Sequence, residues 1–267
     1  MKAGLIENPS REPLVGSADI LLITGALSIG MAMPKATGIY VVGGLALLLI
    51  WALSVKSEAA VHPAVFGLLF FLIPRLGVSF RFWPLNLLAP IIAYGLITGS
   101  VPRLRRSVGW IRKGRMDRSV LLMVIATAVI SAGALVAWVV ILKPDIGHHL
   151  AKMPRLPVWV YPFAGVGFAV LNAAMEEAVF RGVIMEALDR AVGVSGISIG
   201  LQAIPFAALH YPAGFPNGCW GFIMTLVYGI MLGIIRRSAR GMLAVFITHI
   251  AADMTIFSIL TMVFLNA

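Results

Sequence analysis

Apolar residues occur in runs long enough to cross a lipid bilayer, and short polar breaks separate them. An α-helix rises about 1.5 Å per residue and the bilayer core is about 30 Å thick, so a spanning helix needs about 20 mostly apolar residues. The runs cover about 17–33, 36–55, 61–74, 84–99, 119–142, 158–191, 195–210, 219–236 and 242–264. This pattern predicts an all-α fold, a polytopic membrane helix bundle with eight or nine transmembrane helices.

The number of predicted helices depends on the run at 61–74, which is short and ends at Pro74-Arg75. A kinked or re-entrant segment is the alternative there, because irregular backbone is tolerated at membrane depth where protein or a wet cavity surrounds it. Residues 1–19 carry charges of both signs and no clear cleavage site. We therefore expect the first apolar run to be a retained helix rather than a signal peptide.

Composition and charge agree with a membrane protein. Of the 267 residues, 60% are hydrophobic and 12% charged, so a chain of this length cannot hide its apolar segments in a soluble core. The net charge of +10 does not indicate nucleic-acid binding, because the basic residues lie between apolar runs. The basic loop, residues 101–118, holds many of them and is predicted to be cytoplasmic by the positive-inside rule.

Helix parity then gives the sides of the other charged turns. Asp189-Arg190 and the arginines at 236–240 fall on the same side as the basic loop, whereas Arg75 and Arg81 fall on the opposite side. Two basic segments on one side support the cytoplasmic assignment. Trp51, Trp83 and Trp110 suit the aromatic belts of the membrane interface.

The run at 158–191 contains three ionisable residues, Glu176, Glu177 and Arg181. Each charge near the bilayer centre costs roughly 3 kcal/mol, so three so close together imply compensation. Glu177 and Arg181 are four positions apart and can form an ion pair, which is a structural role that needs no catalysis. Glu176 is rotated by about 100° from Glu177 and remains free for general-base chemistry.

Two later runs also carry polar residues at helical spacing. His210 follows Phe206 by four positions, and Asp253 follows His249 by four. His210 alone is typical of a histidine bonded to a carbonyl group, and His249 with Asp253 is compatible with an oriented histidine, a metal-ligand pair or a polar seam. Isolated ionisable groups at membrane depth would each lack a partner, so we expect these residues to converge on one site.

Three motifs in order, EExxxR at 176–181, FxxxH at 206–210 and HxxxD at 249–253, resemble those of the CPBP family of CaaX proteases and bacteriocin-processing enzymes, also called the Abi family. The resemblance covers about residues 119–264, whereas residues 1–118 match nothing in the family. We therefore divide a single integral membrane domain, 1–267, into N-terminal helices with the basic loop and a CPBP-like catalytic core. The resemblance implies a multi-pass protein of a prokaryotic cell membrane.

The resemblance also implies an intramembrane glutamic-type endopeptidase without cofactor or metal. On that model Glu176 and His210 activate a water molecule, Arg181 paired with Glu177 orients the carboxylates, and His249 with residue 253 stabilises the oxyanion. Many relatives that cleave prenylated C-termini have Asn at the last position, whereas this chain has Asp253. An ionised Asp cannot donate a hydrogen bond, so Asp253 is either protonated or acts through His249.

The predicted partners are the lipid bilayer and a membrane-anchored protein or peptide, such as a CaaX-like or sorting-signal C-terminus or a bacteriocin leader. Two alternatives stay open from the sequence. One is a zinc metalloprotease that uses His210, His249 and a carboxylate as ligands, although no HExxH motif is present. The other is a non-catalytic immunity or assembly factor, and a transporter is less favoured because matching broken helices are not visible.

Overall fold

The computed structural model describes residues 14–33 and 38–266, and this part of the chain is helical without a β-strand. The polar stretch at residues 1–13, the break at 34–37 and Ala267 lie outside the described residues. The expectation that residues 1–19 contain no signal peptide falls partly on residues 1–13, which lie outside the described residues. The first described helix, α1, begins at Leu14.

The N-terminal half forms short helices. They are α1 (Leu14–Ala32), α2 (Gly38–Ser54), α3 (Glu58–Leu72), the 3₁₀ turns η1 (Ile73–Arg75) and η2 (Val78–Arg81), α4 (Leu85–Ser100) and α5 (Pro102–Ser107). The third predicted run is continuous helix through α3 and η1, with Pro63 inside its first turns. The run is therefore helical up to the 3₁₀ turn at Ile73–Arg75.

The C-terminal half contains longer helices. They are α6 (Arg118–Leu142), α7 (Gly147–Leu150), η3 (Val158–Val160), α8 (Tyr161–Glu177), the π-helix η4 (Ala178–Ile184), α9 (Met185–Val192), α10 (Gly196–Ala213), α11 (Gly218–Ala239) and α12 (Leu243–Leu265). Asp117 is the N-cap of α6. Its side chain accepts a hydrogen bond from the Val120 backbone N–H at 3.0 Å, which satisfies one of the free donors of the first turn.

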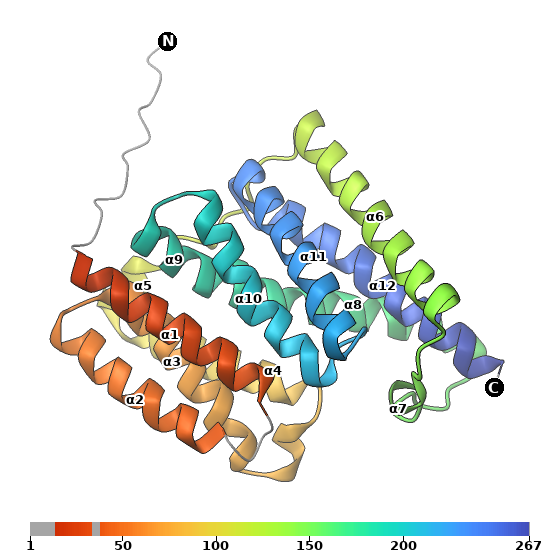
Figure 1. The fold of residues 1–267 in the computed structure, drawn as a ribbon, viewed down its shortest axis with the longest axis horizontal. Helices are drawn as coiled ribbons and strands as arrows, with labels where there is room; N and C mark the ends of the chain where they lie inside the picture. Colours follow the sequence, from red (N-terminus) through yellow and green to blue (C-terminus); the bar gives the residue numbers. More distant parts are fainter. Residues whose placement is uncertain (1–13, 34–37, 267) are drawn as a thin grey trace.

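The two halves meet along α1. In Figure 1 the helices of residues 14–107 form one side of the molecule and α6, α11 and α12 form the other, with α8, α9 and α10 between them. α1 packs against α2 and α3 on one side and against α9 and α10 on the other. α12 packs against α6, α8 and α11, so α8 and α12 lie next to each other at the centre.

Five helical segments of the described residues are long and apolar enough to cross a membrane, so the predicted count of eight or nine is not confirmed. They are Glu58–Arg75, Arg118–Leu142, Val158–Val192, Gly218–Ala239 and Leu243–Leu265. Three apolar helices are shorter: Ser17–Ala32, Gly38–Ser54 and Leu85–Ser100. α10, which the sequence pattern counted as a span, lies between α1 and α11 and carries the buried Gln202.

The basic loop is bound to the turn between α11 and α12. Arg115 N–H donates to the Ala239 carbonyl at 2.8 Å, and the carbonyl of Arg112 accepts from Met242 N–H at 2.8 Å. Gly114 and Gly241 cross so closely that a Cβ on Gly241 would lie 2.2 Å from the Gly114 nitrogen. The two basic segments therefore lie at the same end of the bundle, as helix parity requires.

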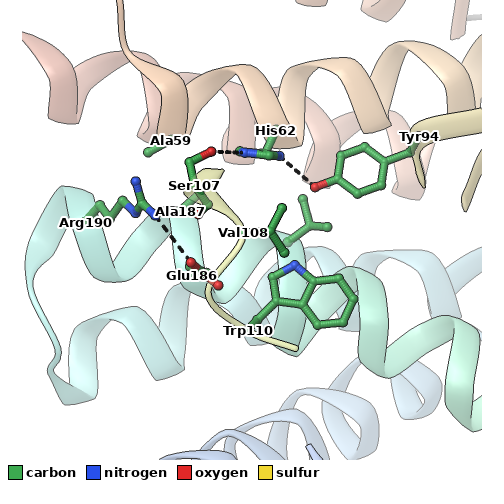
Figure 2. A pocket seen from close by; sticks show the side chains of 10 residues that line it. Ala59, His62, Tyr94, Ser107, Val108, Trp110, Glu186, Ala187 and Arg190 are labelled. Carbon is green, nitrogen blue, oxygen red and sulfur yellow. Dashed lines mark hydrogen bonds and ion pairs between the residues drawn. The ribbon is translucent and has the colours of Figure 1, made fainter. Parts of the chain in front are cut away.

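A polar junction fastens the start of this loop to α3, α4 and α9 (Figure 2). The two ring nitrogens of the buried His62 lie 2.7 Å from the Tyr94 hydroxyl and 2.7 Å from the Ser107 hydroxyl. Glu186 accepts the Gly109 N–H at 2.8 Å. Because buried polar groups destabilise a fold unless they are paired, these contacts fix the loop against the helices.

Candidate active site

The site begins where α8 changes into the π-helix η4. Glu176 and Glu177 are the last residues of α8, and Arg181 lies in η4. The sequence predicted one continuous element here, and the structure keeps it continuous but inserts seven π-helical residues. Trp110 of the basic loop packs against Gly182, where a Cβ would come within 2.7 Å of the indole. π-Helical turns inside α-helices are frequent at functional sites.

The predicted ion pair between Glu177 and Arg181 is present. Arg181 Nη1 donates to Glu177 Oε1 at 2.9 Å, and the Arg181 side chain is fully buried. Its Nη2 lies 3.4 Å from the Gly229 carbonyl, and its guanidinium carbon lies 4.3 Å from the centre of the Phe206 ring. The carboxylate, the carbonyl and the aromatic face together compensate the buried cation.

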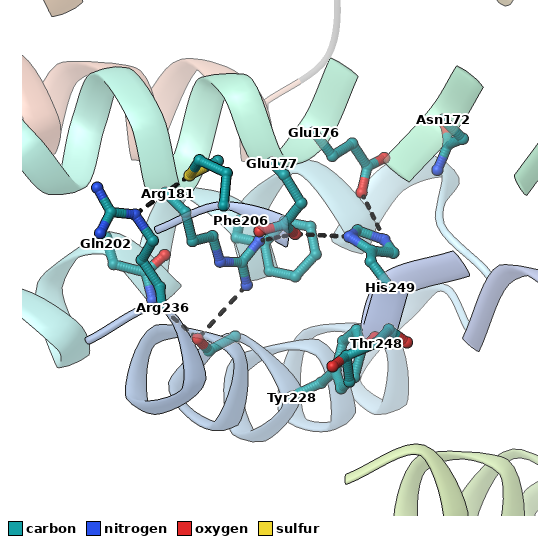
Figure 3. Close-up of polar contacts among 12 residues, drawn as sticks. Asn172, Glu176, Glu177, Arg181, Gln202, Phe206, Tyr228, Arg236, Thr248 and His249 are labelled. Atoms are coloured by element: carbon teal, nitrogen blue, oxygen red, sulfur yellow. Dashed lines mark hydrogen bonds and ion pairs between the residues drawn. The ribbon is translucent and has the colours of Figure 1, made fainter. Parts of the chain in front are cut away.

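His249 lies among three carboxyl groups. Its Nδ1 is 2.6 Å from Glu177 Oε1, and its Nε2 is 3.5 Å from Glu176 Oε2 and 3.8 Å from Asp253 Oδ1. Figure 3 shows Glu176 and Glu177 reaching His249 from adjacent positions at the end of α8. Because Nδ1 faces a carboxylate oxygen at 2.6 Å, it carries the hydrogen and donates to Glu177. The ring orientation is therefore fixed from α8.

Glu176 has the freer carboxyl group of the adjacent pair. It is 7% exposed, and its Oε2 is buried without a hydrogen-bond partner among the described residues, the contact with His249 being longer than a hydrogen bond. A buried acceptor without a partner is costly unless water or a ligand binds it. Glu177 is therefore the more closely paired glutamate, whereas Glu176 Oε2 has only the longer contact with His249.

His210 joins the cluster through an aromatic ring rather than a hydrogen bond. Its ring centre lies 4.8 Å from that of Phe206, and the Phe206 ring is also 5.9 Å from that of His249. His210 Nδ1 lies 3.0 Å from the Phe206 carbonyl oxygen and must donate to it. In the neutral imidazole this leaves Nε2 with a lone pair that can accept a proton.

Sequence reasoning missed Asn172, which lies one turn before Glu176 on α8. Its amide Nδ2 donates to Asp253 Oδ2 at 3.2 Å, and its Oδ1 accepts from the Trp83 indole N–H at 3.2 Å. Trp83, which was predicted as an interfacial anchor, packs against Phe168 with ring centres 5.1 Å apart. Spacing four before Glu176 was the only signal for Asn172, since an isolated Asn has many other roles in a helix.

Gln202 and Gly229 support the site from α10 and α11. Gln202 Nε2 donates to the Gly229 carbonyl at 2.8 Å, the same oxygen that Arg181 approaches. A Cβ on Gly229 would lie 3.0 Å from Ala203, so the helices touch closely at this point. Tyr228 lies beside His249 with ring planes at 90° and donates to the Thr248 carbonyl at 3.2 Å.

The donor set was also tested for a metal centre. In the part of the chain that the structure describes, no three His, Cys, Asp or Glu side chains are arranged to hold a metal ion. His210 and His249, the ligands of the zinc alternative, each contact the ring of Phe206. The zinc alternative therefore has no support in this arrangement.

Buried carboxyl groups and His249, on helices long enough to span a membrane, define the site of a candidate membrane hydrolase. Residues 157–255 match the family model of Rce1-like type II CAAX prenyl endopeptidases. This match confirms the resemblance to the CPBP family over the C-terminal part of the chain. No curated protein and no solved structure matches the chain.

Proposed function

We propose that this protein is an intramembrane endopeptidase in which Glu176 and His210 activate the attacking water. One observation carries the proposal: the buried Oε2 of Glu176 has no hydrogen-bond partner among the described residues and lies next to His249, within the segment that matches the protease family. A buried carboxylate beside histidines in a membrane helix is the arrangement expected of a general base.

In the proposed step, the Glu176 carboxylate removes a proton from water while His210 Nε2 accepts a hydrogen bond from the same water. The oxygen forms a bond to the carbonyl carbon of the scissile peptide, and the carbonyl π electrons move to its oxygen. Collapse of this intermediate breaks the C–N bond. The proton held by Glu176 passes to the departing amine, which restores the carboxylate.

His249 is proposed to stabilise the oxyanion. Its Nδ1 is held by Glu177, so a protonated ring presents Nε2–H toward the space between Glu176 and Asp253. A fixed donor aimed at developing charge contributes more than a mobile one, because it needs no reorganisation during the reaction. Asp253 orients this ring and is itself held by the amide of Asn172. The Arg181 guanidinium balances the charge of the Glu177 carboxylate.

The proposed substrate is a membrane-associated protein or peptide, cleaved near a CaaX-like or sorting-signal C-terminus or after a bacteriocin leader. The family description names prenylated CAAX proteins, which makes lipidated C-terminal peptides the first class to test. A multi-pass location in a prokaryotic cell membrane remains part of the proposal. The bilayer would bring enzyme and anchored substrate into one plane.

The test is cleavage of a library of membrane-anchored peptides by the protein in nanodiscs, followed by mass spectrometry of the products. Wild type should cleave, and Glu176→Gln and His210→Ala should each lower the rate by about 10²-fold or more. Glu186→Gln is the matched control, because Glu186 is a partly buried glutamate of the same continuous element that accepts the Gly109 N–H and has no contact with the site.

Each reaction is repeated with a strong chelator. Loss of cleavage in the two site variants, with wild type unaffected by chelator, supports the glutamate and histidine mechanism. Cleavage that chelator removes and zinc restores would favour the metalloprotease, and cleavage that survives Glu176→Gln would overturn the role given to Glu176.

A further inference from the structure

A second cavity lies apart from the catalytic groups, between α3, α4, the basic loop and the π-helix. Its volume is about 360 Å³, within the range of small-molecule sites. Its lining includes Phe66, Ile91, Val108, Trp110, Ile111, Val179 and Val183. The walls are therefore mainly aromatic and branched aliphatic side chains.

The two hydroxyl groups that border this cavity are already paired elsewhere, whereas the buried indole nitrogen of Trp110 has no hydrogen-bond partner among the described residues. The Tyr94 hydroxyl lies 2.7 Å from His62 Nδ1, and this contact belongs to the polar junction shown in Figure 2. The Thr98 hydroxyl donates to the Tyr94 carbonyl of its own helix at 2.8 Å. These groups present little unsatisfied hydrogen-bonding capacity to an occupant, so the interior suits a hydrocarbon.

The side of the cavity formed by α4 is open because two glycines lie one turn apart. Gly95 and Gly99 both line the cavity, and a Cβ built on either would meet no atom within 4 Å. Both residues are exposed, as is Leu96 between them. In a membrane this surface faces lipid, so a hydrocarbon chain can enter sideways and lie along the helix.

One cationic group borders the cavity, at the end where α4 meets the basic loop. Arg105 lines it and is exposed, and its side chain forms no hydrogen bond or ion pair with another described residue. Arg103, two positions earlier, is instead paired with Glu58. An unpaired guanidinium next to an apolar cavity is complementary to an amphiphile with a hydrocarbon chain and a phosphate.

We propose that this cavity binds an anionic phospholipid of the bilayer, with one acyl chain along Gly95 and Gly99 and the phosphate against Arg105. The charge of the loop favours this occupant, since basic pockets next to transmembrane helices attract anionic headgroups. The site is independent of the proposed protease chemistry. It nevertheless contacts the active-site element, because Val179 and Val183 belong to the π-helix that carries Arg181.

Native mass spectrometry of the full chain, released from detergent and titrated with single lipids, tests this site without an activity assay. Phosphatidylglycerol should bind about tenfold more tightly than phosphatidylcholine with the same acyl chains. Arg105→Gln should remove this preference. Arg106→Gln is its matched control, because Arg106 is the next residue, is equally exposed, and does not line the cavity.

Gly99→Leu should fill the cavity and lower phosphatidylglycerol affinity by about tenfold, and Gly95→Leu provides a second variant with the same expectation. Gly133→Leu on α6 is the control, since Gly133 is also exposed and open but lies away from the cavity. Equal binding of the two lipids, or Gly99→Leu and Gly95→Leu both behaving like Gly133→Leu, would overturn the proposal. Binding of a lipidated peptide but not of phosphatidylglycerol would also overturn it.

Discussion

His249 and Arg181 bind the same oxygen atom, Oε1 of Glu177, at 2.6 and 2.9 Å. The carboxylate therefore connects α12 to the π-helix and fixes the imidazole and the guanidinium at once. Its second oxygen, Oε2, is buried without a partner among the described residues. Of the two adjacent glutamates, Glu177 is thus the one that holds both side chains, which supports the proposal that Glu176 is the base.

Arg181→Met should destabilise the fold strongly. The substitution leaves Glu177 buried without its cation, and breaking a buried pair in this way typically costs about 3–5 kcal/mol. Arg103→Met is the matched control because it breaks a partly exposed pair with Glu58, which is expected to contribute less than about 1 kcal/mol. The measurement is unfolding in mixed micelles titrated with SDS, followed by circular dichroism.

A double variant separates the ion pair from the packing of the arginine stem. If the cost comes from the uncompensated carboxylate, Arg181→Met with Glu177→Gln should recover part of the stability that Arg181→Met loses. Additive losses would contradict this, and would assign the effect to contacts of the side chain with Phe206.

Asn172→Leu should lower kcat by about tenfold while changing KM little, because the amide holds Asp253 and, through it, the ring of His249. Trp83→Phe should have a smaller effect in the same direction. It removes the N–H that fixes the Asn172 carbonyl but keeps an aromatic ring against Phe168.

The kinetic assay is the one that measures peptide cleavage in nanodiscs. Asn86→Leu serves as control, since Asn86 is a partly buried asparagine of α4 whose side chain makes no hydrogen bond to a described residue of the site. Unchanged kcat in Asn172→Leu, with Glu176→Gln inactive in the same assay, would exclude a positioning role for the amide while leaving the protease intact.

Much of the C-terminal fold was predictable from the sequence because charged residues mark the helix ends. The runs predicted at 119–142, 219–236 and 242–264 correspond to Arg118–Leu142, Gly218–Ala239 and Leu243–Leu265. The ion pair of Glu177 and Arg181 was predictable from spacing alone. The roles of the six candidate residues in catalysis stay predictions.

The features that the sequence did not reveal depend on contacts between distant segments. The π-helix forms where Trp110 of the basic loop packs on Gly182. Asn172 gains its place in the site only because α12 brings Asp253 next to it. Neither contact leaves a periodic signal, since each joins single residues from elements that are far apart along the chain.

Gly241→Ala should loosen the basic loop from the turn between α11 and α12. The added methyl group would lie 2.2 Å from the Gly114 backbone nitrogen, so the two backbones must separate, at a typical cost of about 1–3 kcal/mol. Trypsin should then cut the loop faster at Arg112, Lys113 and Arg115. Gly133→Ala, at an open position on α6, should be digested like wild type. Equal digestion rates for the two variants would contradict the prediction that close packing of Gly114 and Gly241 holds the loop.

Acidification should detach the segment around α7. His149 packs edge-on against Phe215 at 5.2 Å, and burial, followed by the adjacent His148 and Lys152, lowers its pKa from 6.5 to about 4. The detached segment therefore binds a proton more readily than the packed one, so packing is fully stabilised above about pH 6.5 and weakens as pH falls toward about 4.

Hydrogen exchange of residues 143–157, corrected for intrinsic rates, should accordingly rise between about pH 7 and about pH 5 in wild type. His149→Gln should remove most of this dependence because it removes the group whose protonation is coupled to packing. The exposed neighbour His148 supplies the control, and His148→Gln should keep the dependence. A response that is lost equally in both variants would show that the two histidines act through their mutual contact, at 3.7 Å between ring centres, rather than through the burial of His149.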